Sequence, residues 1–372
     1  MAYSDVDITP ELVQAVRDAI DVVSLAGEYT SLKRRGKRYV GLCPFHKEKT
    51  PSFSVDPDQG LFYCFGCGAG GDAIKLYMEQ SGDDFPAAIE NLAQRYGIPL
   101  PRKRRGARRR DEPDLGSALE AAAAFFTRAL AKSEAAQGYL DRRQIPPALR
   151  RQYGLGYAPD AWDRLLSALG RRIPTATLEA AGLISRSEKS GKLYDRFRHR
   201  LMFPVHSPAG RLVGFGGRTL GDDRAKYINT AETAYFHKGN LLYGLHQAKR
   251  ALRDGGRAVL VEGYFDVLGM AAAEIPWAVA GMGTALTAEQ ARLLARFADE
   301  VVVAYDADDA GEKAFERALP LLLDAGLVVR RARFPTGHDP DSLRLEAGPE
   351  AVRAAVEEAA DGVWLLIRRR IP

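Results

Sequence analysis

The segment that decides the fold of the N-terminal region is Cys43-Pro44-Phe45-His46, followed after seventeen residues by Cys64-Phe65-Gly66-Cys67. All three cysteines of this 372-residue chain lie in that window, and two residues separate the members of each ligand pair. Two such pairs place four sulfur or nitrogen donors around one ion, as a closed tetrahedral zinc site requires. The alternative is one or two buried cysteines beside a surface histidine, but cysteines without a shared role would be scattered. We therefore predict a zinc ribbon that holds one structural zinc ion.

The rest of residues 1–100 fits a single small module around this site. Thr9-Pro10-Glu11 combines an N-cap, a first-turn proline and an early acid, which predicts the start of a helix. Alternation of apolar residues predicts short strands close to the zinc ligands. The expected helices are residues 10–25 and 72–96, and the expected strands are residues 53–55 and 61–63.

A basic block follows this module. Residues 101–114 carry seven arginine and lysine residues between Arg102 and Arg110 and show no apolar pattern. A block of like charge stays extended and cannot pack a core, so we interpret it as a solvated linker that also contacts phosphates. The formal net charge of +5 agrees with a polyanionic partner, although charge balance alone is weak evidence.

Composition narrows the class of protein. At 46% hydrophobic residues the chain can bury real cores, and its length predicts two or three domains. We find neither an apolar run of about twenty residues nor a signal-peptide pattern, so we expect a soluble, cytoplasmic protein with no membrane partner. Because every thiol is assigned to zinc, we expect no disulfide framework.

Carboxylates follow two apolar runs in the C-terminal part of the chain. Residues 257–261 lead into Glu262, and residues 301–305 lead into Asp306 and Asp308. Strands alternate with helices in this region, which predicts a parallel sheet whose functional groups collect at the carboxyl ends of its strands. We expect the three carboxylates to converge on Mg²⁺ or Mn²⁺, because a cation relieves their mutual repulsion. Two further candidate ligands follow the expected strand at 327–334: Asp339 and Asp341.

The alternative interpretation is that acids after strands are only helix caps and turn residues. We favour that interpretation for Asp309, which lies just before Gly311. For Asp306 and Asp308 we favour the ligand role. Glu262 directly follows apolar residues, and glutamate is a poor cap, so a cap does not explain it.

Several ordered motifs resemble those of bacterial DnaG-type primases, and this resemblance covers nearly the whole chain. The stretches VEGYFD (261–266), GMGTAL (281–286) and YDAD (305–308) look like a Toprim domain, and the zinc ribbon precedes them. Two further stretches are similar to the same family: 196–205 and 226–245.

The resemblance implies a multidomain α+β and α/β fold with an N-terminal zinc ribbon, a mixed α/β middle subdomain and a Toprim parallel-sheet catalytic domain. The expected regions are a zinc-binding ribbon domain (1–100), the basic linker (101–114), an N-terminal subdomain of the RNA polymerase core with a basic template-binding surface (115–255), the Toprim catalytic subdomain (256–345) and a C-terminal helical tail (346–372).

The activity that the resemblance implies is that of a DNA primase, which synthesises short RNA primers de novo from ribonucleoside triphosphates on single-stranded DNA for DNA replication. Glu262, Asp306 and Asp308 then become the catalytic centre and hold two ions of magnesium or manganese, one at the attacking 3′-hydroxyl and one at the leaving pyrophosphate. Three further acids match positions that line this site: Asp266, Asp339 and Asp341.

Basic residues among aromatics and glycines in the middle region favour contact with nucleic acid. The six candidates are Arg143, Arg196, Arg198, Arg218, Lys226 and Lys238. Arg143, Arg218, Lys226 and Lys238 resemble the family's basic ridge, which tracks the template and receives nucleotide phosphates. One departure is Gln144, where the family commonly has glycine after the arginine.

The zinc ribbon of such proteins is thought to contact the initiation site on the template. The candidate residues for this contact are Phe53, Phe62, Tyr63 and Lys47. Phe53 and Phe62 could equally form the small core of the ribbon, and we favour the core for both.

Other functions also use a Toprim domain. A topoisomerase needs a tyrosine nucleophile in a separate strand-passage domain, for which we find no candidate. A Toprim nuclease shares the metal chemistry, but the ribbon argues against it. A zinc-dependent single-strand binder with a decayed active site is the non-enzyme alternative, and the intact Glu262, Asp306 and Asp308 argue against decay.

The family usually continues beyond the Toprim motifs with a helical subdomain and a helicase-binding domain. Neither is expected before Pro372, so we interpret the chain as either a truncated or a naturally short form. A replicative helicase is therefore a family-implied partner whose usual binding domain is absent from these residues. The family also implies a location at the bacterial replication fork.

Overall fold

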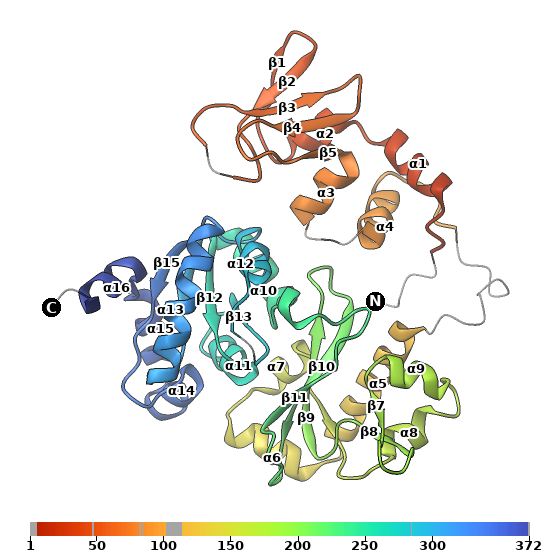
Figure 1. Ribbon diagram of the computed structural model, residues 1–372, viewed down its shortest axis with the longest axis vertical. Helices are drawn as coiled ribbons and strands as arrows, with labels where there is room; N and C mark the ends of the chain where they lie inside the picture. Colours follow the sequence, from red (N-terminus) through yellow and green to blue (C-terminus); the bar gives the residue numbers. More distant parts are fainter. Residues whose placement is uncertain are drawn as a thin grey trace. The chain divides into compact units, whose positions relative to one another are not determined.

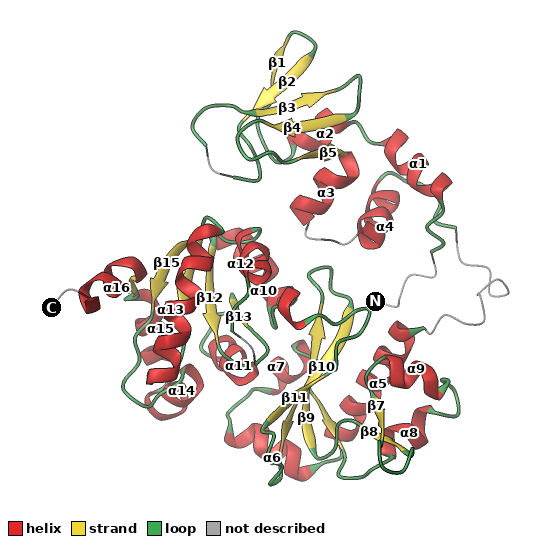
Figure 2. Ribbon diagram, viewed as in Figure 1, coloured by secondary structure: helices red, strands yellow, loops and turns green. Residues whose placement is uncertain are grey.

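The computed structural model describes residues 6–46, 48–81, 83, 85–101, 114–283 and 285–370 (Figures 1 and 2). Lys47, Thr284 of the GMGTAL stretch and the basic run 102–110 lie outside these ranges. The chain divides into two compact units, one within residues 3–112 and the other within residues 113–372. Among the described residues, no helix has both the length and the apolar character needed to cross a membrane.

In its described part, the N-terminal unit is an antiparallel sheet accompanied by short helices. The strands pair in chain order and are β1 (Lys33–Arg35), β2 (Arg38–Gly41), β3 (Phe53–Asp56), β4 (Leu61–Cys64) and β5 (Gly70–Asp72). The helices are α1 (Pro10–Ala19), α2 (Val22–Gly27), α3 (Ala73–Ser81) and α4 (Phe85–Arg95). The predicted strands 53–55 and 61–63 are thus confirmed, each extended by one residue.

Both predicted long helices of this unit are wrong, because each is two helices. The Thr9 hydroxyl caps α1 as expected, accepting from the Leu12 N–H at 3.2 Å. The Asp21 carboxylate then accepts from the Ser24 N–H at 2.7 Å and starts α2, so an internal cap ends the expected helix 10–25. The expected helix 72–96 is instead the two helices α3 and α4.

Aromatic rings form the centre of this small unit. Phe53 is 0% exposed and Phe62 is 3% exposed, and their ring centres lie 5.5 Å apart. The core role favoured for these two residues is therefore confirmed. Tyr63, whose side chain alternates to the other face of β4, is 48% exposed.

The second unit begins with a mixed α/β part that is built on an antiparallel sheet in the order β11-β10-β9-β6. Gly156 of β6 allows α5 to lie close to this sheet, since a Cβ atom there would be 2.5 Å from the Phe126 Cβ. The helices of this part are α5 (Leu115–Leu130), α6 (Glu134–Arg142), α7 (Pro147–Gln152), α8 (Arg164–Leu169), α9 (Thr175–Ala180) and the 3-10 helix η1 (Lys238–Asn240). The strands are β6 (Gly156–Ala158), the hairpin β7 (Ile184–Arg186) and β8 (Leu193–Asp195), then β9 (Arg200–His206), β10 (Leu212–Thr219) and β11 (Tyr227–Asn229).

The remainder of this unit contains the predicted parallel sheet, in the order β13-β12-β14-β15-β16. Strands β13, β12, β14 and β15 are parallel, and only β16 is antiparallel to its neighbour. The strands are β12 (Arg257–Val261), β13 (Ala278–Ala280), β14 (Glu300–Val303), β15 (Val328–Arg331) and β16 (Ala360–Asp361). The helices are α10 (Leu245–Gly255), α11 (Tyr264–Ala272), α12 (Ala288–Ala295), α13 (Asp309–Asp324), α14 (Pro340–Ala347), α15 (Pro349–Glu357) and α16 (Gly362–Arg370).

The antiparallel and parallel sheets share one hydrophobic core. Phe203 of β9 stacks on Tyr264 of α11 with ring centres 4.8 Å apart, and buried residues of both sheets belong to the same cluster. Tyr264 donates its hydroxyl hydrogen to Asn229 Oδ1 at 2.6 Å, and Asn229 Nδ2 donates to the Met282 carbonyl at 2.9 Å. Gly216 of β10 completes the contact, because a Cβ atom there would lie 2.3 Å from the Tyr264 ring.

Candidate functional site

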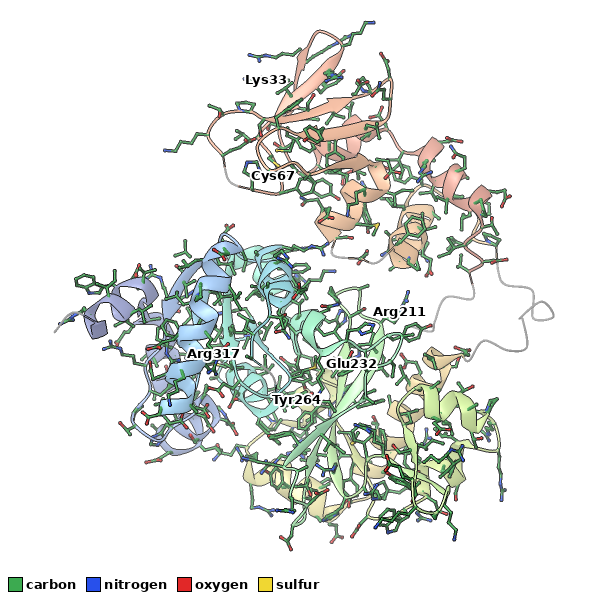
Figure 3. The ribbon with its side chains drawn as sticks, viewed as in Figure 1. Lys33, Cys67, Arg211, Glu232, Tyr264 and Arg317 are labelled. Carbon is green, nitrogen blue, oxygen red and sulfur yellow. The ribbon has the colours of Figure 1, made fainter. Side chains whose placement is uncertain are left out.

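The four predicted zinc ligands come together in the N-terminal unit. One ligand atom from each of Cys43, His46, Cys64 and Cys67 lies within 4.8 Å of all the others. Cys64 ends β4 and Cys67 follows in the next turn, while Cys43 and His46 come from the loop after β2. Figure 3 labels Cys67 in this unit. The donor set of three sulfurs and one nitrogen is that of a closed zinc site, so these residues fit the ion.

Backbone groups support the sulfur atoms. The Phe45 N–H donates to Cys43 Sγ at 3.4 Å, and the Gly66 N–H donates to Cys64 Sγ at 3.4 Å. Burial, together with the hydrogen bonds to the neighbouring Cys64 and Cys67, raises the pKa of the Cys43 thiol to about 12. A cation is therefore needed to hold Cys43 as the thiolate that binds metal.

Glu48 is a residue of this site that the sequence analysis missed. Its carboxylate accepts from the Cys43 N–H at 2.7 Å and from the Ser52 N–H at 3.0 Å. His46 Nε2 lies 3.4 Å from Glu48 Oε2, and His46 Nδ1 faces Cys64 Sγ at 3.9 Å. Glu48 therefore orients the ring that presents Nδ1 to the metal position. The only signal in the sequence was an acid two residues after the histidine.

Glu262 and Asp306 meet at the carboxyl edge of the parallel sheet, as predicted. Leu260 of β12 pairs with Val303 of β14, so the residues that follow the two strands emerge side by side. The Asp306 N–H donates to Glu262 Oε1 at 3.1 Å. Glu262 is exposed and Asp306 is half-buried, so a ligand can reach both carboxylates from solvent.

The electrostatics of this edge are those of crowded carboxylates. Burial, followed by the charges of Glu262, Asp339 and Asp308, raises the pKa of Asp306 to about 7. Partial burial of its carboxylate also raises the pKa of Glu262. Burial and the neighbouring acids raise the pKa of Asp266 well above its usual range. A divalent cation would remove this repulsion, because carboxylate oxygens are the ligands that such an ion prefers. Among the described residues, however, the only group of three or more histidine, cysteine or acidic side chains whose ligand atoms lie together is the zinc site, so Glu262, Asp306 and Asp308 do not form a three-ligand group in this structure.

The helix cap after β14 is Asp308 and not Asp309, so that prediction is wrong. Asp308 Oδ1 accepts from the Gly311 N–H at 2.8 Å, and Asp309 is the first residue of α13. The shift by one residue follows from the extended backbone of Asp308, which places its side chain over the first helical turn. Gly311 has no room for a side chain, since a Cβ atom would lie 2.2 Å from the Asp306 carbonyl oxygen.

Arg331 is a second residue that the sequence analysis missed. It lies in β15, is 4% exposed, and donates to the carbonyls of Tyr305 at 3.0 Å and Asp306 at 3.3 Å. It also contacts Glu312 of α13 at 3.2 Å. Arg331 therefore fixes the backbone that carries Asp306. The sequence signal was a pair of arginines, Arg330 and Arg331, at the end of a short strand that begins with two valines.

The three additional acids all accept hydrogen bonds within the protein. Asp266 Oδ2 accepts from the Gly263 N–H at 2.9 Å, and Asp339 Oδ1 accepts from the Ser342 N–H at 2.6 Å, which caps α14. Asp341 is fully buried, and its two oxygens accept separately from Arg143 and Arg344.

The predicted basic residues fall into separate groups. Arg143 and Arg218 come together over aromatic rings: the Arg143 guanidinium lies 5.0 Å from the Phe265 ring centre, and that of Arg218 lies 5.2 Å from the Tyr139 ring centre. Arg218 Nε also donates to the Tyr139 hydroxyl at 2.6 Å. Gln144 adopts a φ of +47°, so the turn after Arg143 keeps the left-handed backbone that glycine would favour.

Arg196 and Arg198 line a cavity of about 520 Å³. Arg196 is half-buried and donates to the Asn229 carbonyl at 2.8 Å, which ties β11 to this cavity. The Arg198 guanidinium lies 4.3 Å from the ring centre of Trp162, an aromatic residue that is 66% exposed and that the sequence analysis missed. Lys226 is exposed just before β11, and Lys238 begins η1.

Three family models match this chain. Residues 8–108 match the CHC2 zinc finger, residues 125–249 match the N-terminal domain of the DNA primase catalytic core, and residues 259–344 match a Toprim-like domain.

Curated relatives and solved structures agree with these models. A DNA primase of Pseudomonas aeruginosa is 42% identical over 95% of this chain and 55% of its own length. One of Halalkalibacterium halodurans is 42% identical over 94% of this chain and 59% of its own length. The chain therefore spans little more than half of these relatives. The crystal structure of the Aquifex aeolicus primase, with zinc-binding and RNA polymerase domains, has a TM-score of 0.64 and 38% identity, covering 96% of this chain and 86% of its own. A DnaG primase catalytic domain bound to single-stranded DNA has a TM-score of 0.64 and 36% identity, covering 69% of this chain and 82% of its own.

Proposed function

The chain belongs to the family of bacterial DnaG-type DNA primases, and on that premise we propose that it synthesises short RNA primers on single-stranded DNA. The observation that carries this proposal is the pair of Glu262 and Asp306, joined by a 3.1 Å hydrogen bond at the open edge of the parallel sheet. The same unit holds the arginines and aromatic rings that single strands require. Relatives that bear the name DNA primase support the same activity.

In this proposal Glu262, Asp306 and Asp308 hold the catalytic magnesium or manganese ions. A bound pair of ions would assist attack of the 3′-hydroxyl on the α-phosphate and neutralise the leaving pyrophosphate. Asp308 keeps one oxygen free for this role, because only Oδ1 is used in the helix cap. Asp339 adds negative charge beside the site, burial favours the neutral form of Asp266 by raising its pKa, and Asp341 acts through its pairing with Arg143.

The basic residues receive the nucleic acid and the nucleoside triphosphates. Arg143 and Arg218 are held by aromatic rings, so their guanidinium groups are oriented before a ligand arrives. Arg198 with Trp162 offers a cation beside a ring on which a base can stack. Lys226 and Lys238 add two further cations for this contact. Arg196 holds β11 in place by donating to the Asn229 carbonyl.

The regions take the roles expected of them: a ribbon (1–100), a linker (101–114), a template-binding part (115–255), a Toprim part (256–345) and a helical tail (346–372). The ribbon, with Tyr63 exposed on β4, contacts the template at initiation. We propose that this primer synthesis takes place at the replication fork. In this proposal a replicative helicase is a further partner.

The test is de novo synthesis by the zinc-loaded protein on mixed-sequence single-stranded DNA, with labelled ribonucleotides and Mg²⁺ or Mn²⁺. We expect short RNA that requires both template and metal. Asp306→Asn should abolish it, and Asp309→Asn is the matched control, since Asp309 is an exposed acid three residues away. Shortening of the DNA would instead indicate a nuclease. No product despite normal DNA binding would contradict the proposal for this chain.

A further inference from the structure

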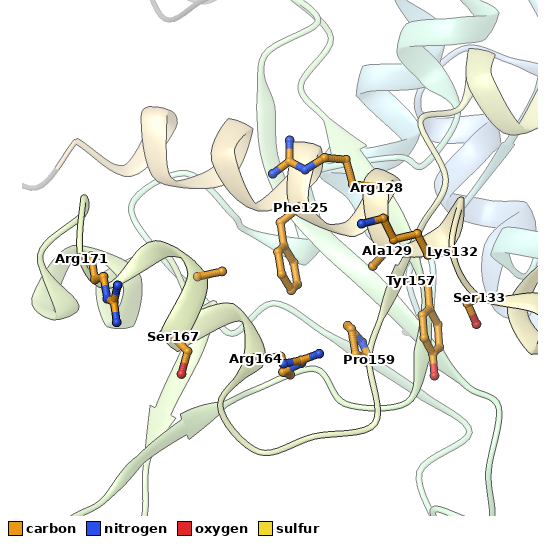
Figure 4. Close-up of a pocket in the computed structure, with 11 residues that line it drawn as sticks. Phe125, Arg128, Ala129, Lys132, Ser133, Tyr157, Pro159, Arg164, Ser167 and Arg171 are labelled. Atoms are coloured by element: carbon orange, nitrogen blue, oxygen red, sulfur yellow. The ribbon is translucent and has the colours of Figure 1, made fainter.

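A cavity of about 720 Å³ lies between α5 and α8, apart from the residues assigned above to metal and template (Figure 4). Its walls come from α5 and the two residues before α6, from β6 and Pro159, and from α8 and Arg171 after it. Its volume is within the range of ordinary ligand sites. We call it the α5–α8 cavity.

The charge of this cavity is of one sign. Among the described residues that line it, four are cationic and none is acidic: Arg128, Lys132, Arg164 and Arg171. Within the described part of the chain, none of the four side chains has a recorded ion pair or hydrogen bond. Nearby arginines behave differently, since Arg150 pairs with Asp141 and Arg186 pairs with Glu179. Clustered cations without carboxylate partners favour a ligand with several negative charges.

The cavity also contains aromatic surface. Figure 4 shows Phe125 extending from α5 towards Arg164, with Tyr157 on the β6 side. Phe125 is half-buried, and its ring centre lies 5.6 Å from that of Phe126, which anchors it against the core. A fixed ring between guanidinium groups suits a base that stacks while its phosphates contact the cations.

The α5–α8 cavity adjoins the cavity lined by Arg196 and Arg198, which we call the second cavity. The Tyr157 hydroxyl, on the α5–α8 side, forms a 2.8 Å hydrogen bond with His199 Nδ1, on the other side. The His199 N–H donates to the carbonyl of Pro159, another lining residue, at 3.2 Å. The two cavities therefore meet at the contact between Tyr157 and His199.

We propose that the α5–α8 cavity is an additional binding site for single-stranded DNA, and that it extends the template-binding surface beyond Arg198. This inference rests on the proposed function, because it takes the second cavity as part of the template path. Arg128 and Lys132 contact phosphates from the α5 side, Arg164 and Arg171 contact them from the α8 side, and Phe125 stacks on a base. A long template is thereby held at more points than a short one.

The experiment measures the affinity of the whole protein for single-stranded oligonucleotides of increasing length, by fluorescence anisotropy over a range of salt concentrations. The test variant is Arg128→Gln/Arg164→Gln, which removes one cation from each side of the cavity. The control variant is Arg250→Gln/Arg292→Gln, which removes the same charge from helices α10 and α12, where these side chains are 94% and 65% exposed. Thermal unfolding checks that both variants keep the native fold.

For long oligonucleotides we expect the slope of log Kd against log salt to fall by about 1.4 in the test variant, roughly 0.7 for each lost phosphate contact. Short oligonucleotides that occupy only the second cavity should bind as before, and the control should match the native protein. Phe125→Leu should weaken long-strand binding about tenfold while leaving the salt slope unchanged.

Equal losses in test and control variants, or no loss in either, would overturn the proposal. Tripolyphosphate serves as a separate probe: if the test variant loses tripolyphosphate but keeps DNA binding, the cavity binds free nucleotides and the proposal is wrong. Short-strand binding and primer synthesis are measured independently. A result that contradicts the additional DNA site is therefore distinguishable from one that contradicts the proposed function.

Discussion

Arg331 is a charged side chain in a buried strand, and its hydrogen bonds explain why it is there. It donates to the backbone carbonyls of Tyr305 and Asp306, so it works on the main chain of the site and not on a ligand. Its planar guanidinium reaches these acceptors in a fixed fork, a geometry that the lysine ammonium does not reproduce. The positions of the carboxylates therefore depend on a residue that carries none of the chemistry.

We expect Arg331→Lys to lower the rate of primer synthesis about 10- to 100-fold, because small displacements of catalytic groups are costly. Affinity for single-stranded DNA should not change, since Arg331 faces the protein interior. Rate and affinity are measured on the same preparation. The control is Arg330→Lys, whose side chain is 43% exposed and pairs with Glu300. Equal rate losses in both variants would contradict a specific role for Arg331.

Gln144 carries backbone strain in the turn that follows Arg143. Its φ of +47° costs a residue with a Cβ atom roughly 1–2 kcal/mol. Gln144→Gly should remove that cost, and part of the gain is lost to the greater freedom of glycine in the unfolded chain. We expect a net stabilisation of about 0.5–1 kcal/mol in urea unfolding. Gln137→Gly, inside α6, should destabilise by about 1 kcal/mol or more. Destabilisation by both would mean that the Gln144 side chain makes a larger contribution than the strain.

At the scale of elements, local patterns and the Thr9 cap were predictable, whereas two other caps were not. The zinc ligands and the strand ends at Glu262 and Asp306 follow from spacing and from apolar runs, which are properties of a few neighbouring residues. The break between α1 and α2 depends on Asp21 accepting from the Ser24 N–H, in competition with continued helix. The choice of Asp308 over Asp309 depends on the φ and ψ of one residue. Neither choice is encoded in hydrophobic periodicity.

The loop that carries His46 depends on Glu48. We expect Glu48→Gln to weaken zinc binding about 10- to 100-fold, because partners that orient a metal-bound histidine typically matter that much. The amide oxygen can still accept from the Cys43 and Ser52 N–H groups, so the lost groups are Oε2, which accepts from the Ser52 hydroxyl, and the negative charge beside His46. Zinc affinity is measured by competition with a chelator. Glu79→Gln, on α3 of the same unit, is the control and should bind zinc normally.

The contact between β9 and α10 predicts a dependence of stability on pH. Burial, together with the nearby His246, lowers the pKa of His206 to about 4. The unfolded chain takes up a proton near pH 6.5, whereas the folded chain does so only near pH 4. The contribution of His206 to the free energy of unfolding is therefore fully present above about pH 6.5. It falls as the pH decreases towards 4, with a loss of about 2 kcal/mol at pH 5. Urea unfolding at pH 7.5 and pH 5 measures this loss.

His206→Gln should make the unfolding free energy less sensitive to this change in pH. His338→Gln is the control, because the hydrogen bond to Glu346 raises the pKa of His338 and gives it the opposite sign. An unchanged pH dependence in His206→Gln would show that another group is responsible.

At the scale of the whole molecule, family resemblance predicted more than residue patterns did. The order of ribbon, basic middle part and parallel sheet was expected from motifs that lie far apart in the sequence. The roles of Arg331 and Trp162 were not, because each depends on which distant segments meet in space. The pairing of Arg143 with Asp341, 198 positions apart, is of the same kind.

The contact of Gly216, Asn229 and Tyr264 has a mechanical consequence. The sheet that carries Arg218 and the sheet that carries Glu262 share one tightly packed core. The two sheets therefore cannot open relative to each other between cycles of the proposed nucleotide addition. The distance between Arg218 and Glu262 is therefore fixed. In the proposed primer synthesis, each advance by one nucleotide would therefore require the template and the product to move relative to both sheets together.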